Sequence, residues 1–162
     1  MEPLHYKVHL EPNLETFTFQ GTIVIEIMAE NSVDQIILNA KDLSLQSCIF
    51  RNAEKCGECI FSFDSENEEV IIKLPERIEG VIELIIKYFG KINDLMVGFY
   101  RSKYEHNGQV KYIAVTQFEE RDARRALPCF DHPSKKATFD VEFVIDEDLK
   151  GIANTPIIEE RN

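Results

Sequence analysis

The stretch VTQFEERDARRALPCFDHP, residues 115–133, begins like a β-strand but carries charged and amide side chains where a buried strand carries apolar ones. If this strand runs to Glu119, the side chains of Gln117 and Glu119 project from one face, because side chains alternate along a strand. Their Cα atoms would lie about 6.6 Å apart. Carboxylate and amide oxygens at that spacing suit a cation rich in hydrogen-bond donors, such as an ammonium group. Phe118 would point the opposite way and anchor the core.

A plainer interpretation of the same residues is the solvated face of an edge strand, paired with Arg121 or Arg124. Exposed charges often pair on protein surfaces, so the spacing by itself favours this second interpretation. The residue pattern alone therefore does not establish a binding site.

Five more charged residues follow closely in the chain. They are Arg121, Asp122, Arg124, Arg125 and Asp131. Guanidinium groups pair bidentately with carboxylates, so these residues can form a fixed network. Contact of Arg124 or Arg125 with a bound ammonium would oppose binding, because like charges repel. We therefore predict that the five residues form a structural network near the site.

The cysteines do not form a recognisable metal-binding pattern. They are Cys48, Cys56, Cys59 and Cys129. Only CGEC, at residues 56–59, has the spacing of zinc ligands, and a structural zinc site needs a second pair. We predict a turn at Gly57 between two short strands, with thiols that stay reduced. Cys129 lies among apolar neighbours, which is typical of a buried structural thiol.

The histidines also give no metal site. His5 and His9 are four residues apart, but they lie in a predicted strand, which separates them too far to share a metal ion. His106 and His132 are isolated in the sequence. We therefore predict no metal ligands in this chain.

Composition limits the class of protein. The chain has 162 residues, of which 44% are hydrophobic and 10% aromatic, enough for a single globular domain with its own core. The formal net charge of -11 argues against nucleic acid or an anionic membrane surface as a partner, because both would repel the chain. No segment approaches about 18 consecutive apolar residues, and residues 1–13 do not resemble a signal peptide. We predict a cytoplasmic protein.

Alternating apolar and polar residues, rich in β-branched side chains, predict strands along nearly the whole chain. The predicted strands cover residues 6–10, 17–30, 35–39, 43–50, 59–64, 69–76, 80–90, 98–104, 110–118 and 137–145. Turn sequences such as HNGQ, residues 106–109, are typical of antiparallel sheets. We predict an all-β fold of about ten strands in an antiparallel two-sheet sandwich or saddle. At most one helical turn follows Glu119, before Pro128 ends it.

A set of motifs carries a resemblance to a known family. TQFE, DARR, PCFD-x-P, K-A-T-F and A-N-T-P occur in this order between residues 116 and 156. Together they resemble the amino-terminal domain of zinc aminopeptidases of the aminopeptidase N family, which includes the puromycin-sensitive and tricorn-interacting enzymes. GFYRSKY at residues 98–104 and the opening strands at residues 5–27 are similar too, so the resemblance covers nearly the whole chain.

This resemblance implies a function for the first two residues considered above. It implies that Gln117 and Glu119 reach into the active site of a following domain, where Glu119 holds the free α-amino group of a peptide substrate. Gln117 would line the pocket for the first side chain and bond the peptide backbone. The parent protein would be a zinc-dependent metallopeptidase that releases N-terminal residues from peptides.

The family's catalytic motifs, H-E-x-x-H, a further Glu ligand and G-x-M-E-N, do not occur in this chain. We therefore expect residues 1–162 to form one β domain, incomplete at its C-terminal end, that binds no zinc and is inactive without its catalytic domain. A free-standing β-sandwich that binds a protein partner through edge strands stays open as an alternative. We also expect the isolated chain to self-associate through uncovered strands.

Overall fold

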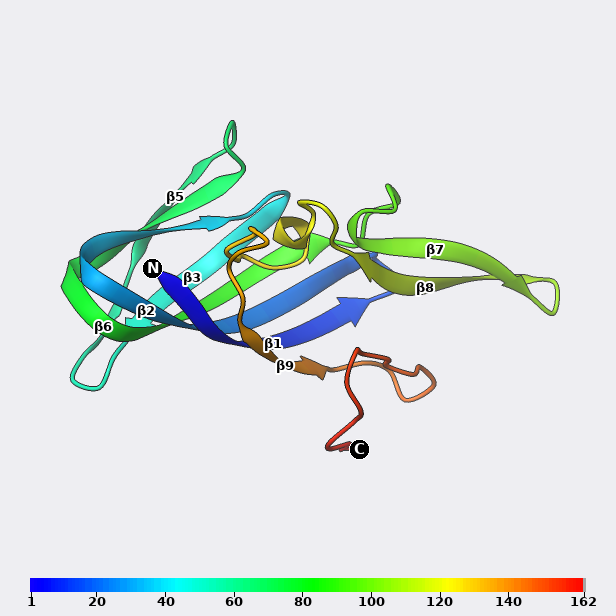
Figure 1. Cartoon of the computed structure of the whole chain (residues 1–162). Helices are drawn as coiled ribbons and strands as arrows, with labels where there is room; N and C mark the ends of the chain where they lie inside the picture. The colour runs from blue at the N-terminus through cyan, green and yellow to red at the C-terminus, as the bar shows by residue number, and fades with distance from the viewer. Residues whose placement is uncertain (162) are drawn as a thin grey trace.

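The computed structural model describes residues 1–161, which form two β-sheets and one short helical turn (Figure 1). The strands are β1 (Glu2–Asn13), β2 (Thr18–Asn39), β3 (Leu43–Arg51), β4 (Cys56–Glu58), β5 (Ile60–Asp64), β6 (Glu69–Lys91), β7 (Gly98–His106), β8 (Gln109–Gln117) and β9 (Thr138–Phe143). A single 3-10 turn, η1 (Ala123–Arg125), is the only helical element in this part of the chain. Among these residues, no helix has the length and apolar character to cross a membrane.

The larger sheet has the strand order β4-β3-β6-β2-β1-β9, and β5 pairs with the first half of β6. Its centre consists of β2 with 22 residues and β6 with 23 residues, paired antiparallel along most of their length. Strands this long accumulate twist, and Figure 1 shows the sheet strongly curled. The buried apolar side chains of β2 and β6 lie on one face of this sheet. That face carries the core.

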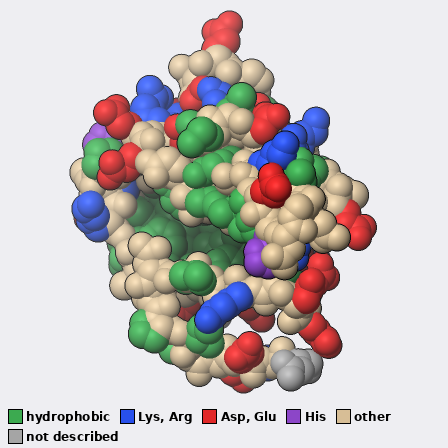
Figure 2. Space-filling model, turned by 90° about the vertical axis from the view of Figure 1, so that its right-hand side faces the viewer, with side chains coloured by type: hydrophobic (Ala, Val, Ile, Leu, Met, Phe, Trp, Pro, Cys, Tyr) green, Lys and Arg blue, Asp and Glu red, His purple; other side chains and the backbone are tan. Residues whose placement is uncertain are grey.

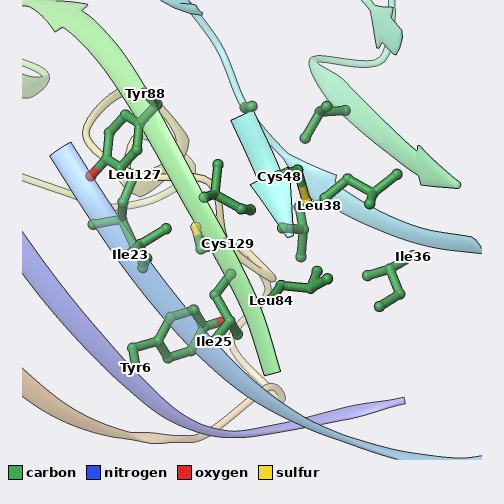
Figure 3. Packing of buried hydrophobic residues seen from close by; sticks show 14 of the residues in the cluster. Tyr6, Ile23, Ile25, Ile36, Leu38, Cys48, Leu84, Tyr88, Leu127 and Cys129 are labelled. Atoms are coloured by element: carbon green, nitrogen blue, oxygen red, sulfur yellow. The ribbon is translucent and has the colours of Figure 1, made fainter. Parts of the chain in front are cut away.

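Alternation along the two central strands builds the core. On β2 the side chains of Ile23 and Ile25 are fully buried, as is Leu84 of β6 (Figure 3). Ile86 of β6, which pairs with Ile23, is buried as well. The intervening positions point to the outer face and carry more polar side chains. Because each buried aliphatic side chain contributes roughly 1.5–3 kcal/mol, this alternation also fixes the register of the strands.

Tyr88 shows how closely the core is packed. Its ring lies over Gly21, where a Cβ atom would be only 2.2 Å from the ring carbon Cζ, so only glycine fits there. The Tyr88 hydroxyl is buried and has no hydrogen-bond partner among residues 1–161. A polar group in that situation costs free energy of folding.

The predicted all-β class and the two sheets are confirmed. In one respect the pairing differs from a purely antiparallel arrangement, since β9 joins β1 in parallel and makes the larger sheet mixed. Pairs of predicted strands also merge. Residues 17–30 and 35–39 belong to β2, whose register shifts between Ala29 and Gln35, and residues 69–76 and 80–90 belong to β6.

The predicted turn at Gly57 is wrong. Gly57 lies within β4, opposite Phe50 of β3, and the turn comes earlier, where Asn52 accepts a hydrogen bond from the Lys55 backbone N–H at 2.8 Å. A Cβ atom at residue 57 would lie 2.8 Å from the Phe50 ring. The glycine therefore provides space for a core side chain and not a change of chain direction.

The smaller sheet is the β7–β8 hairpin, which projects away from the larger sheet in Figure 1. Its middle part contacts Phe17, whose ring lies edge-on to that of Tyr112 at 4.9 Å and 4.2 Å from the Arg101 guanidinium carbon. Phe118, expected in the core, is 37% exposed. The reason is that β8 ends at Gln117 in a two-stranded hairpin, so no second sheet covers the residue that follows.

Candidate functional site

Gln117 and Glu119 lie at the base of the β7–β8 hairpin. Gln117 is the last residue of β8 and pairs with Gly98, the first residue of β7. Glu119 follows in a turn closed by a hydrogen bond from the Asp122 backbone N–H to the Phe118 carbonyl at 2.9 Å. Both side chains are exposed, and neither makes a hydrogen bond or ion pair with another of the residues that the structure describes. Their oxygens are therefore free to bind a ligand.

Gly98 brings this turn and the 3-10 helix together. Its φ of +65° belongs to the left-handed region that glycine adopts without strain. A Cβ atom there would lie 2.5 Å from Cβ of Arg125 and 3.1 Å from the Asp122 carbonyl oxygen. The start of β7 can therefore pack directly on η1, which fixes η1 beside the strand end that carries Gln117.

Arg124 is the centre of a buried charge network. It is only 1% exposed, and its Nε donates to Oδ2 of Asp131 at 2.8 Å while its Nη1 donates to Oε2 of Glu68 at 3.1 Å. Glu68 also pairs with Lys41. The pKa of Glu68 is held below its ordinary value, chiefly by the hydrogen bond from Lys41 and further by the charge of Arg124. The network thus joins η1 to the segment between β5 and β6.

A second pair of contacts holds the other arginine of η1. Arg125 donates from Nε to Oδ1 of Asp122 at 2.8 Å and also pairs with Asp42, which precedes β3. Arg121 is exposed and pairs with no carboxylate within residues 1–161. The structure therefore brings four of the five predicted network residues into ion pairs and leaves Arg121 outside them.

Backbone hydrogen bonds attach the same loop to the end of β2. The backbone N–H of Lys41 donates to the Arg124 carbonyl at 2.9 Å, and Asn39 and Cys129 exchange two backbone hydrogen bonds of 2.8 and 3.1 Å. The Asn39 side chain also accepts from the Asp131 N–H at 3.1 Å. Cys129 itself is buried, as predicted from its apolar neighbours, and burial raises the pKa of its thiol.

Sequence reasoning missed the partners of this network. Glu68 is 56 residues from Arg124, and Asp42 is 83 residues from Arg125. A carboxylate in a polar loop carries no local signal that a distant guanidinium will bind it. Only the pairing of β2 with β6, which brings their ends together, could have indicated these contacts.

Exposed apolar side chains lie on strands near this loop, among them β8 and β9. Figure 2 views the molecule from the hairpin side and shows hydrophobic side chains gathered around a hollow on that face. Strands at this end contribute exposed residues, including Ile113 on β8 at 47% and Phe139 on β9 at 52%.

Comparison with known proteins decides the family. The Peptidase M1 N-terminal domain family matches residues 2–162, which is nearly the whole chain. The chain belongs to this family. The resemblance carried by the motifs at residues 116–156 is thereby confirmed.

Three curated relatives illustrate the match. Aminopeptidase M1 of Arabidopsis thaliana is 39% identical over 166 residues, covering 98% of this chain and 19% of the relative. Puromycin-sensitive aminopeptidase of Caenorhabditis elegans is 38% identical, covering 98% and 17%. Glutamyl aminopeptidase of Sus scrofa is 30% identical, covering 100% and 18%. The chain therefore spans less than a fifth of the length of each relative.

The residues of this M1 N-terminal domain do not fit a zinc site. Within residues 1–161, no three His, Cys, Asp or Glu side chains come together in a way that could hold a metal ion. His5 instead contacts Asp140 of β9 at 3.2 Å, and His9 contacts Glu142 at 2.8 Å and Glu11 at 3.0 Å. These histidines connect β1 to its parallel neighbour.

Proposed function

We propose that this domain contributes Gln117 and Glu119 to the active site of a zinc aminopeptidase, where Glu119 binds the free α-amino group of a peptide. The zinc and the catalytic groups would come from an adjoining domain. The observation that carries the proposal is the pair of exposed, unpartnered polar side chains at the end of β8, beside a loop held by buried ion pairs. Gln117 would bond the peptide backbone and line the pocket for the first side chain.

The proposal is supported first by the firm attachment of the loop that carries Glu119. Glu119 lies three residues before Asp122, and the next three residues form η1, which Gly98, Glu68 and Asp131 hold in place. A carboxylate on a loop that is already ordered loses little conformational entropy when it binds an ammonium group. The pair can then contribute most of its interaction energy to binding.

The balance of charge supports it as well. Guanidinium groups near an ammonium site would oppose binding, but Arg124 and Arg125 each pair with two carboxylates. Arg121 is solvent-exposed, so its charge is screened. The carboxylate of Glu119 is therefore free to attract a cation.

The test requires a catalytic domain. Residues 1–162 would replace the matching residues of Arabidopsis aminopeptidase M1, and kcat/KM would be measured on free and N-acetylated peptides. Changing Glu119→Gln should lower kcat/KM on free peptides by roughly 10- to 100-fold, because a charge-assisted hydrogen bond contributes about 1.5 to 3 kcal/mol. Gln117→Ala should have a smaller effect that depends on the first side chain.

Glu120→Gln is the matched control, because Glu120 is the neighbouring exposed carboxylate and removing it changes the net charge equally. It should leave kcat/KM within about twofold, since an exposed charge is screened. Equal losses in the two variants would contradict the assignment of Glu119. Activity unchanged by Glu119→Gln would favour a solvated turn without a substrate.

A second candidate function is a protein-binding module. It is favoured by β9, which pairs with β1 on one side only and exposes Phe139, Val141 and Phe143 at 52%, 48% and 37%. An edge strand with exposed apolar residues can accept a strand from another chain, including a second copy of this one. Because this function does not involve Glu119, the assay above distinguishes the two candidates.

A further inference from the structure

Two cysteines lie directly opposite each other at the edge of the larger sheet. In the antiparallel β3–β4 pair, Ile49 is opposite Glu58, so the next position places Cys48 opposite Cys59. The backbone N–H of Cys59 donates to the Cys48 carbonyl at 2.8 Å, which extends the ladder to this pair. Opposite residues in antiparallel strands have Cα atoms about 4.5–5.5 Å apart, within the range of about 4.4–6.8 Å found in disulfides.

Both thiols point to the same side of the sheet. Cys48 is 2% exposed and Cys59 is 8% exposed, while Ile49 and Glu58 between them turn outward. Figure 3 shows the Cys48 sulfur among the core side chains. The register and the shared face therefore bring the two sulfurs together inside the sheet.

The other cysteines are not placed for such a bond. Cys56 is opposite Arg51 on the outer side of the same hairpin, and three residues of extended strand separate it from Cys59 by about 10 Å. Cys129 forms an isolated bridge with Asn39 at the end of β2 and is opposite no other cysteine. Cys48 and Cys59 are therefore the only pair that the strand register brings face to face among the described residues.

We propose that Cys48 and Cys59 form a reversible disulfide when the protein meets a hydroperoxide such as hydrogen peroxide. The Cys59 thiolate attacks one peroxide oxygen, which forms a sulfenic acid and, after protonation, releases water. The Cys48 sulfur then attacks the Cys59 sulfur, the S–S bond forms, and the hydroxyl of the sulfenic acid leaves as a second water. The two thiols are oxidised by two electrons in total, and the peroxide is reduced by the same two electrons.

The environment of the two sulfurs supports this division of roles. The hydrogen bond from the Cys48 thiol lowers the pKa of Cys59, because it stabilises the thiolate. The same hydrogen bond and burial raise the pKa of Cys48, which therefore stays protonated as the donor. Reactivity follows the thiolate, so Cys59 would react first.

Access to Cys59 comes from the edge of the sheet. β4 has only three residues and pairs with β3 alone, so local opening of this strand exposes Cys59 without unfolding the core. Cys59 also lies where the chain leaves β4 for β5, which pairs with β6 instead. A bond to Cys48 would therefore hold both β4 and the connection from β4 to β5 against β3.

The experiment treats the 162-residue chain with hydrogen peroxide under native conditions, then unfolds it, alkylates the remaining thiols and measures the intact mass. We expect a loss of two hydrogen atoms and alkylation of two of the four thiols, with a linked peptide that joins Cys48 to Cys59. A thiol reductant should restore all four. The oxidised form should melt several degrees higher, at most about 10 °C, because the bond closes a short loop of the unfolded chain.

Variants make the assignment specific. Cys56→Ser keeps the opposed pair and should still lose two hydrogen atoms, whereas Cys59→Ala and Cys48→Ala should not form an intramolecular bond. A linked peptide in the native protein that joins Cys56 to Cys59 would overturn the proposal. It would also be overturned if Cys48 and Cys59 both stay alkylatable on unfolding after peroxide treatment at concentrations that oxidise the exposed Cys56.

Discussion

Replacing Arg124 by methionine is the sharpest test of how the site is held. Arg124→Met keeps most of the side-chain volume but removes the donors to Asp131 and Glu68. Asp131 has a side-chain exposure of 11% and would keep only a long 3.4 Å contact from the Arg124 backbone N–H. Glu68, at 27%, would keep Lys41. Most of the destabilisation would therefore come from Asp131.

The expected loss in the free energy of unfolding follows from the burial of these two carboxylates. Removing one partner of a buried ion pair leaves a charge without compensation and costs about 3–5 kcal/mol. Because Glu68 retains a partner and is closer to solvent, we expect a value near the lower end, about 3 kcal/mol. Arg124→Met combined with Asp131→Asn should recover about half of the loss, since the variant no longer buries an unpaired charge.

Urea unfolding of the 162-residue chain measures this loss, and Arg125→Met is the matched control. Arg125 has the same chemistry in the same turn, but its partners Asp42 and Asp122 are 67% and 23% exposed, on average more than those of Arg124, so its removal should cost less, about 1 kcal/mol. Acid titration adds a second readout. The lowered pKa of Glu68 contributes stability that is present above its ordinary value of 4.5 and is lost as the pH falls through the folded value. The acid-unfolding midpoint should therefore rise in Arg124→Met.

If Arg124→Met and Arg125→Met destabilise the protein equally, the buried network does not hold the loop. The same conclusion would follow if Arg124→Met were as stable as the natural protein. In either case the support for Glu119 would have to come from Gly98 and the backbone bonds to β2 alone.

Two further predictions concern the core and the sheet edge. Tyr88→Phe should raise the free energy of unfolding by about 1 kcal/mol, because the Tyr88 hydroxyl has no partner in the described chain. Tyr6→Phe should lower it by a similar amount, since the Tyr6 hydroxyl accepts from the Phe130 N–H at 3.2 Å, and changes of the same sign in urea unfolding would contradict this reasoning. The pKa of His9 is raised above 6.5, first by the hydrogen bond to Glu142, so its contribution to stability is complete below pH 6.5 and is lost as the pH rises through the folded value. A ring-proton titration by NMR should show the pKa of His9 falling in Glu142→Gln, and an unchanged value would rule out this pairing in solution.

Local pattern predicted the strands well because alternation is a local signal. Prediction from local alternation failed where pairing between residues far apart in the sequence decides the structure. The predicted strands at residues 17–30 and 35–39 appeared separate because polar residues interrupt them, yet both pair with β6, and the irregular residues form a bulge. The parallel position of β9 beside β1 was equally hidden, because strand order depends on contacts more than 130 residues apart, such as His9 with Glu142 at a separation of 133.

At the site, the sequence indicated which residues face solvent but not what holds them. Alternation is enough to place Gln117 on an exposed face, and the resemblance suggested the role of Glu119, which stays a prediction. The anchors Glu68 and Asp42 could not be predicted, since their neighbours in sequence resemble any polar loop. Phe118 was misplaced for a related reason, because alternation gives a side but not whether another layer covers it.

The buried position of Arg124 is informative because it is energetically unfavourable in isolation. Desolvating a guanidinium and two carboxylates costs several kcal/mol for each ion, and an apolar side chain in the same space would often be at least as stable. Such a network is therefore better explained by geometry than by stability. Fixed donor directions hold η1 in one orientation toward Glu68, which precedes β6, and toward Asp131, whereas an apolar contact is not directional. The role proposed for Glu119, to present its carboxylate to a ligand, would need that restriction and would account for the charge concentrated at residues 119–131.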